Sequence, residues 1–193
     1  MALSGGTSPQ PLLAEIARQP LDWNALHVFQ VDERLAPDGD AARNLTSIES
    51  ALCKHGPMPR WQLHAMPVAA ADLAAAAAAY GHELEICAGR PPLLDVVHLG
   101  LGADGHTASL FPGDAALKVA GRSIAVAESH AGYRRLTLTF PVINSARHIV
   151  WFVTGAGKSD VLARLLAGNL AAPAGQITRG CAAVFADEAA AGK

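Results

Sequence analysis

Short apolar segments alternate with segments of helical character along most of this chain. The apolar segments have the length of strands and are bounded by glycine, proline or charged residues. They predict strands at 25–31, 93–99, 123–126, 136–140, 148–153 and 182–185. The intervening segments predict helices at 9–18, 41–53, 69–79 and 158–166, and the alanine-rich third helix is expected to end at Tyr80-Gly81. This alternation favours an α/β fold, in which helices cover both faces of a mostly parallel sheet.

Length, charge and cysteine content narrow the class of protein. A chain of 193 residues is long enough for one domain with a sizeable core, and we expect 1–193 to be a single domain. The net charge is −2 and the Lys and Arg residues are scattered, which provides no basic stripe for nucleic acid. The three cysteines are isolated from one another, as in reduced cytoplasmic proteins. No apolar run approaches the roughly 20 residues of a membrane span, and the first residues do not resemble a secretory signal. We therefore expect a cytoplasmic protein without nucleic-acid or membrane partners.

The segment 99–113, L-G-L-G-A-D-G-H-T-A-S-L-F-P-G, carries the clearest chemical signal. It follows the predicted strand 93–99, and loops at the carboxyl ends of parallel strands open into the crevice where α/β proteins bind ligands. Asp104-Gly105 predicts a turn, and His106 is able to take or give a proton near neutral pH. We therefore predict that His106 is a catalytic base.

Two other interpretations of this loop are open. Its glycines also match the dinucleotide-binding pattern G-x-G-x-x-G, which requires a long helix after the third glycine and an acidic residue about 20 residues further on. Pro112 would end such a helix after roughly one turn. In the simplest interpretation the loop is an ordinary turn and His106 is a surface residue, although an ordinary turn would not need three glycines.

The segment S-G-G-T-S-P at 4–9 predicts an anion-binding loop. Gly5 and Gly6 would let the backbone approach a ligand closely, and Ser8 followed by proline is a favourable N-cap for the helix at 9–18. Free N–H groups at a helix start favour phosphate. The alternative is an ordinary capped turn.

Two cations follow other predicted strands. Arg34, in D-E-R after the strand 25–31, has a guanidinium that is able to hold a phosphate through two hydrogen bonds. An ion pair with a carboxylate at the strand end is the alternative. Lys158 opens the last predicted helix, where a positive charge is unfavourable unless an anion binds there. The segment before it is not a nucleoside-triphosphate loop, because Phe152 stands where that motif requires its first glycine.

The sequence gives no indication of a metal site among the remaining histidines, and none of a serine hydrolase. Six of them show no spacing typical of metal ligands, namely His27, His55, His64, His82, His130 and His148. His98 lies inside a predicted strand, and we expect a core residue whose hydrogen bonds are satisfied. The chain also lacks the G-x-S-x-G motif that places a nucleophilic serine.

Four segments, in this order, resemble the motifs of the 6-phosphogluconolactonase family, within the wider group that includes glucosamine-6-phosphate deaminase. They are S-G-G-T-S-P at 4–9, V-D-E-R at 31–34, G-L-G-A-D-G-H-T-A-S-L-F-P-G at 100–113, and R-L-T-L-T at 135–139 running on to G-A-G-K at 155–158. The resemblance spans nearly the whole chain and implies a Rossmann-like α/β fold. It also implies hydrolysis of 6-phospho-D-glucono-1,5-lactone to 6-phospho-D-gluconate in the oxidative pentose phosphate pathway, with no cofactor. We expect a monomer or a weak homo-oligomer.

The resemblance also implies roles for individual residues. His106 would take a proton from the attacking water and return it to the ring oxygen, and Asp104 would orient the imidazole or only shape the turn. The residues expected to bind the phosphorylated sugar lactone are Ser4, Gly5, Gly6, Thr7, Asp32, Arg34 and Lys158. Asn44 stands where the family often has asparagine, and its role is open. Backbone N–H groups of the glycine loop are candidates for stabilising the oxyanion.

Two other functions are open at this point. An amino-sugar phosphate isomerase-deaminase of the same group is one, although such deaminases have glutamate where this chain has Phe111 and tyrosine where it has Arg34. A sugar-phosphate-sensing module that binds without turnover is the other, and an intact His106 argues against it.

The chain differs from the family pattern at its start. Members of the family usually have a helix and a full strand before S-G-G, whereas Met1-Ala2-Leu3 precede Ser4 here. We therefore expect the first helix and most of the first strand to be missing from this fold.

Overall fold

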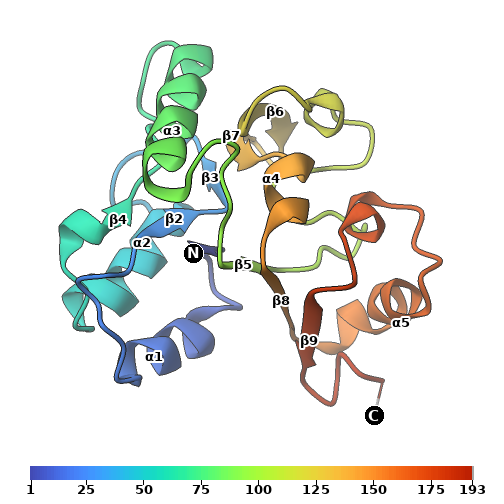
Figure 1. Cartoon of the computed structure of the whole chain (residues 1–193). Helices are drawn as coiled ribbons and strands as arrows, with labels where there is room; N and C mark the ends of the chain where they lie inside the picture. Colours follow the sequence, from blue (N-terminus) through green and yellow to red (C-terminus); the bar gives the residue numbers. More distant parts are fainter. Residues whose placement is uncertain (193) are drawn as a thin grey trace.

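The computed structural model of the chain describes residues 1–192, and its framework is a six-stranded parallel sheet (Figure 1). The strands, in their order across the sheet, are β4 (Leu63–His64), β2 (Val28–Gln30), β1 (Ala2–Leu3), β5 (Val96–Leu99), β8 (His148–Val153) and β9 (Ala182–Ala186). Their pairings are all parallel. The predicted α/β class with a mostly parallel sheet is confirmed.

Three further strands form a separate antiparallel sheet. Their order is β3 (Asp32–Arg34), β7 (Tyr133–Leu138) and β6 (Ile124–His130). The strands predicted at 123–126 and 136–140 therefore exist but do not belong to the parallel sheet. The chain passes from β2 to β3 through Val31, whose carbonyl accepts the Leu138 N–H at 2.8 Å. As a result Arg34, expected at the end of the strand predicted at 25–31, lies within a separate strand of the second sheet.

The helices fill the connections between strands. They are α1 (Gln10–Arg18), α2 (Asn44–Glu49), which continues as a π-helix (Ser50–Lys54), α3 (Leu73–Ala88), α4 (Phe140–Ser145) and α5 (Ser159–Ala167). Short 3₁₀ turns occupy Arg60–Gln62, Ala115–Lys118, Ala156–Lys158 and Pro173–Gln176. The predicted helices are all present, with shifted ends, and α4 was not predicted.

The alanine-rich helix α3 starts and ends later than predicted. It starts late because the Asp72 side chain accepts the N–H groups of Ala74 and Ala75 and so caps the helix. It continues past Gly81 and ends at Gly89, which has φ +88°. Gly81 is tolerated within the helix because it packs beside the start of β6. A Cβ added to Gly81 would lie 3.5 Å from Ser123 Cβ.

The start of α1 differs from the prediction. Pro9 occupies the N-cap position and no side chain caps the helix. The prediction that Ser8 is the N-cap is therefore wrong. The Gln10 N–H donates to the Thr7 carbonyl at 3.3 Å and closes a turn before the helix.

Two apolar clusters hold the parallel sheet between its helices. Ala2 belongs to the larger cluster, together with Tyr80 of α3, whereas Leu3 belongs to the smaller one with Leu13 of α1. Neighbouring residues of a strand point to opposite faces, so the sheet is covered on both sides. Within the described part of the chain, no helix combines the length and the apolar composition that a membrane crossing requires.

Candidate active site

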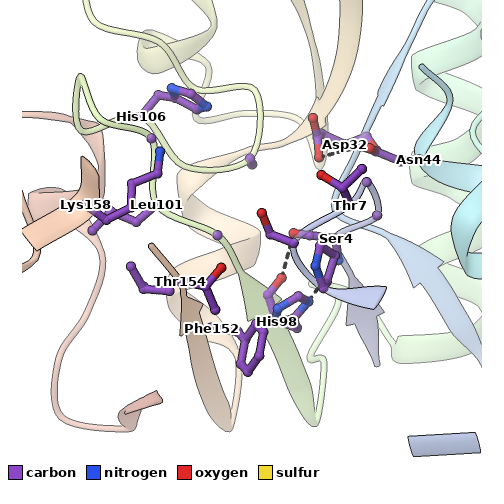
Figure 2. Close-up of a pocket in the computed structure, with 18 of the residues that line it drawn as sticks. Ser4, Thr7, Asp32, Asn44, His98, Leu101, His106, Phe152, Thr154 and Lys158 are labelled. Atoms are coloured by element: carbon purple, nitrogen blue, oxygen red, sulfur yellow. Dashed lines mark hydrogen bonds between the residues drawn. The ribbon is translucent and has the colours of Figure 1, made fainter. Parts of the chain in front are cut away.

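A cavity of about 320 Å³ lies at the carboxyl ends of the parallel strands (Figure 2). It is lined by the segments that follow β1, β2, β5 and β8. Eight residues predicted for the site line it, namely Ser4, Gly5, Gly6, Thr7, Asp32, Arg34, His106 and Lys158. Asp104, the remaining predicted residue, lies outside the lining and contacts His106. Four ordered motifs, far apart in the sequence, therefore meet in one pocket.

The His106 imidazole is held by Asp104. Its Nδ1 lies 2.6 Å from Asp104 Oδ1, and the same oxygen accepts the His106 backbone N–H at 3.2 Å. An ionised carboxylate only accepts hydrogen bonds, so Nδ1 carries the proton and Nε2 keeps a free lone pair. The turn residue thus fixes the tautomer of the histidine as well as the shape of the loop.

The pKa values of this pair favour a neutral imidazole beside an ionised carboxylate. Burial lowers the pKa of His106 below its ordinary value of 6.5, and the nearby Asp104 carboxylate only partly offsets that effect. Partial burial opposes ionisation of Asp104, but the hydrogen bonds from His106 outweigh it and lower the pKa of Asp104. At neutral pH His106 is therefore able to accept a proton at Nε2.

The glycines of the His106 loop are required by close contacts. An added Cβ on Gly102 would lie 2.1 Å from His106 Nδ1. Gly105 has φ +82°, and a Cβ there would lie 2.5 Å from the Ala172 Cβ. The N–H groups of Gly102 and Gly105 donate to carbonyls inside the loop, those of His106 and Gly102 respectively. Both groups are thus engaged in shaping the loop, and they are unsuited to the oxyanion role proposed from the sequence.

Two aromatic rings flank His106. The Phe111 ring centroid lies 4.6 Å from that of His106, and the His130 ring stacks on Phe111 at 3.9 Å. Arg135 lies over the Phe111 ring, with its guanidinium carbon 5.2 Å from the centroid. His130 had been assigned no role from the sequence, since nothing in its neighbours indicates that β6 runs past the glycine loop.

The loop 4–9 is built differently from the predicted anion cradle. Gly6 has φ +97°, but its N–H donates to Ser47 Oγ at 2.9 Å. The Ser4 N–H is taken by His98 Nδ1 at 3.3 Å. Gly5 is required because a Cβ would lie 2.4 Å from the Asn44 carbonyl oxygen. The N–H groups of Gly5 and of Thr7 and Ser8, the last two on the exposed turn, are the remaining candidates for an anion.

Three cations line the pocket. The Arg34 guanidinium contacts neutral oxygens, donating to the Ala42 carbonyl at 2.6 Å and to Asn44 Oδ1 at 3.5 Å, instead of forming the alternative carboxylate pair. Lys158 precedes α5 and is half-buried. The third cation, Arg135, is buried and lies 3.9 Å from Asp32 Oδ2. Arg135 belongs to the R-L-T-L-T segment at 135–139, but its neighbours along the chain do not indicate a place in the pocket.

Asp32 and Asn44 form the buried side of the pocket. Asn44 Nδ2 donates to Asp32 Oδ1 at 3.1 Å, and Ser109 Oγ donates to Asp32 Oδ2 at 2.5 Å. Burial raises the pKa of Asp32 above its ordinary value, while the Ser109 hydrogen bond and the Arg135 charge partly offset this effect. With both oxygens engaged by the protein, Asp32 is suited to positioning its neighbours.

The neighbouring carboxylate, Glu33, supports the same part of the pocket. It is fully buried, accepts the backbone N–H groups of Asn44 and Leu45 at 2.8 Å, and lies 3.0 Å from Arg43 Nε. It therefore fixes the start of α2, and with it the position of Asn44. The acidic pair in D-E-R is the signal that could have suggested this role.

His98 differs from the satisfied core residue predicted. It is buried, but it lines the pocket and its Nε2 has no hydrogen-bond partner among residues 1–192. Burial lowers the pKa of His98 to about 4. The ring is therefore neutral at physiological pH, and it accepts the Ser4 N–H and so anchors the loop 4–9 to β5 (Figure 2).

Comparison with known sequences gives a consistent picture. Residues 1–186 match the family described as glucosamine-6-phosphate isomerases/6-phosphogluconolactonase. The chain is similar to the 6-phosphogluconolactonase of Synechocystis sp., with 43% identity over 171 aligned positions, in an alignment that covers 86% of this chain and 71% of that protein. It is 35% identical to the 6-phosphogluconolactonase of Streptomyces coelicolor over 193 aligned positions, gaps included, in an alignment that covers 90% of this chain and 73% of that protein.

Solved structures agree with the sequence comparison. The 6-phosphogluconolactonase of Trypanosoma brucei superposes with a TM-score of 0.85 and 30% identity, over 99% of this chain and 84% of that one. A monomeric glucosamine-6-phosphate deaminase superposes with a TM-score of 0.82 over 99% of this chain and 86% of that one, but at 19% identity. The second likeness extends to the fold alone.

Proposed function

This chain belongs to the family of glucosamine-6-phosphate isomerases and 6-phosphogluconolactonases, and we propose that it hydrolyses 6-phospho-D-glucono-1,5-lactone to 6-phospho-D-gluconate. The observation that carries the proposal is the pairing of His106 with Asp104 in a pocket that also collects cations from three parts of the chain. A proton acceptor at one place and positive charge at another suit a neutral lactone that carries a phosphate.

The reaction needs little more than a positioned base, because a lactone is an activated ester. His106 Nε2 takes a proton from a water molecule, whose oxygen attacks the lactone carbonyl carbon. The resulting tetrahedral intermediate collapses, the bond between that carbon and the ring oxygen breaks, and the protonated His106 returns its proton to the ring oxygen. Asp104 keeps the ring in the required tautomer and stabilises the transient imidazolium.

The phosphate is assigned to the cations of the pocket. Arg34 follows β2 and Lys158 follows β8, so they enter the pocket from strands on either side of β1 and β5, and Arg135 of β7 adds a third positive charge. The turn that carries the N–H groups of Thr7 and Ser8 supplies further donors. Ser4, Gly5, Gly6 and Asp32 shape this end of the pocket, through the contacts of the loop 4–9 and of Asn44.

The cellular setting follows from the proposed activity. The reaction belongs to the oxidative pentose phosphate pathway and needs no cofactor and no metal ion at the pocket. We place it in the cytoplasm, carried out by residues 1–193 as one domain, in a monomer or weak homo-oligomer without a nucleic-acid partner. Light scattering of the purified protein tests the oligomeric state.

The proposal is tested by two substrates offered to the same preparation. Acid release from 6-phosphogluconolactone should exceed its spontaneous hydrolysis, whereas glucosamine 6-phosphate should yield no ammonia. Deamination requires acid–base groups beyond one histidine, and the residue beside His106 is the apolar Phe111. His106→Asn should lower the enzymatic rate by about 10²–10⁴-fold.

Three results would contradict the proposal. Ammonia without accelerated lactone opening would favour the deaminase. Tight binding of sugar phosphate without any turnover would favour a sensing module. A His106→Asn variant with the wild-type rate would remove His106 from the mechanism.

A further inference from the structure

Outside the pocket, three side chains with metal-binding atoms lie close together. His27 directly precedes β2, His64 ends β4, and Cys87 lies in the last turn of α3. One ligand atom from each lies within 4.8 Å of the others. His27 Nδ1 and His64 Nε2 are 2.9 Å apart. They are the one such cluster found within residues 1–192, and none of the three lines the pocket.

His64 is already fixed in the orientation that a metal ligand needs. Its Nδ1 is hydrogen-bonded to Glu83 Oε1, so its Nε2 lone pair faces His27. Its ring stacks on Phe29 with centroids 4.2 Å apart and planes 5° from parallel. Its backbone carbonyl accepts the Tyr80 hydroxyl at 3.0 Å. A carboxylate on the far nitrogen of a histidine is the usual second partner of a metal-bound imidazole.

We propose that His27, His64 and Cys87 bind one zinc-like divalent cation, through Nδ1, Nε2 and Sγ respectively. Two imidazoles and a thiolate suit a borderline-soft ion, whereas Mg²⁺ and Ca²⁺ prefer oxygen. Zinc bonds of about 2.0–2.3 Å in a tetrahedron place ligand atoms roughly 3.3–3.6 Å apart. The three atoms reach that spacing if the two histidines separate by a few tenths of an ångström and Cys87 moves inward. A water molecule completes the tetrahedron.

Binding moves two protons. In the metal-free protein the proton between the histidines lies on His27 Nδ1, because His64 Nδ1 donates its own to Glu83. On metal binding His27 changes tautomer and carries its proton on the exposed Nε2. Cys87 loses its thiol proton to solvent as the sulfur–metal bond forms, so one proton is released for each cation bound.

The location indicates a stabilising site. β4 is one of the two edge strands of the parallel sheet and pairs with β2, while α3 packs beside them (Figure 1). A cation held by all three elements binds the folded chain more tightly than the unfolded one, so it raises the free energy of unfolding. The active site is built from other residues, and its turnover is independent of the cation.

The experiment uses the whole chain, reduced and treated with a chelator, and titrated with Zn²⁺ and separately with Co²⁺. One equivalent of Zn²⁺ should bind and raise the melting temperature. Co²⁺ should give the absorption of a tetrahedral site together with a thiolate-to-metal charge-transfer band. Cys87→Ser and His64→Gln should lose stoichiometric binding, and Mg²⁺ should not compete. Glu83→Gln, which changes only the partner of His64, should weaken binding by about 10–100-fold.

Matched variants separate this site from other thiols and imidazoles. Cys53→Ser and His82→Gln remove a cysteine and an exposed histidine elsewhere and should bind Zn²⁺ like the wild type. Lactone hydrolysis by every variant, unchanged from the wild type, reports that each one is folded. The proposal is overturned by the lack of a stoichiometric site, by a charge-transfer band that persists in Cys87→Ser, or by its loss in Cys53→Ser. None of these results bears on the lactonase proposal, which is measured separately.

Discussion

His106 and Asp104 are two residues apart, so a single tight turn supplies both the proposed base and the group that orients it. Asp104 is nearly half-exposed, and its effect acts through one hydrogen bond at 2.6 Å. Burial and Asp104 act in opposite directions on the pKa of His106, and burial dominates. Because His106 works as a base only when neutral, the balance between these two effects sets the acid limit of activity.

Asp104→Asn tests that balance. The enzymatic rate of the wild type should be constant around neutral pH and fall as the pH drops through the lowered pKa of His106. Removing the carboxylate removes a charge that raises this pKa, so the acid limb should move to lower pH. The rate should also fall, by less than the 10²–10⁴-fold expected for His106→Asn. A pH–rate profile of kcat/KM, corrected for spontaneous hydrolysis, measures both effects. An acid limb that stays in place would show that Asp104 only shapes the turn.

Arg34→Ala and Lys158→Ala test whether these two cations bind the phosphate of the lactone. Each removes one charge-assisted interaction, worth roughly 1.5–3 kcal/mol, which corresponds to a KM for the phosphorylated lactone raised by roughly 10–150-fold. Hydrolysis of unphosphorylated gluconolactone should be unaffected. Arg134→Ala is the matched control, because Arg134 precedes the buried Arg135 on β7 and is itself exposed. Equal losses on both lactones would remove these cations from phosphate recognition.

At the scale of the elements, the glycine loop and its neighbours decide where His106 lies. The Ala174 N–H donates to the Gly105 carbonyl at 2.9 Å, so the loop after β5 is joined to the 3₁₀ turn Pro173–Gln176. On its other side, Thr107 Oγ1 donates to the Gly100 carbonyl at 2.9 Å. The loop is thus joined to the 3₁₀ turn at Gly105 and closed on itself between Gly100 and Thr107, so a change within it is transmitted to the imidazole.

Gly102→Ala should displace the His106 ring without unfolding the protein. The new Cβ would lie 2.1 Å from His106 Nδ1. The His106 side chain can rotate away from it because it lines the pocket. We expect kcat to fall toward the value of His106→Asn, with a small change in melting temperature. Gly121→Ala, where nothing lies within 4 Å of the added methyl, is the control. A fully active Gly102→Ala would mean that the productive ring position differs from the one described.

Local sequence patterns predicted the positions of helices and strands better than the pairing of strands into sheets. The strand β8 was predicted with its observed bounds, because its apolar run ends at a charged residue on one side and at a glycine-containing loop on the other. The assignment of β6 and β7 to a second sheet was missed, since alternation of apolar residues does not encode pairing. For the same reason the sequence pointed to His106 and Arg34 but gave Arg135 and His98 no place in the pocket. Their roles depend on contacts between residues far apart in the chain.

At the scale of the whole molecule, the pocket joins segments from the start, middle and end of the chain. A ligand that binds it therefore stabilises the entire fold. Saturation with 6-phosphogluconate at about 100 times its Kd should add about 2.7 kcal/mol to the free energy of unfolding. The melting temperature of a single transition should then rise by roughly 5–11 °C. Gluconate at the same concentration should have a smaller effect. Two transitions, of which the ligand shifts only one, would contradict a single domain.

The position of β1 has a consequence for synthesis on the ribosome. This two-residue strand lies between β2 and β5, with Ala2 paired to Phe29 and to Val97. At about 5–20 residues per second, Leu3 is made roughly 5–20 s before Leu99, the last residue of β5. The loop that follows β1 then waits for Lys158 before its pocket is complete. A nascent chain therefore has no complete sugar-phosphate site before Lys158 has been made, and the metabolite cannot assist folding through this pocket until then.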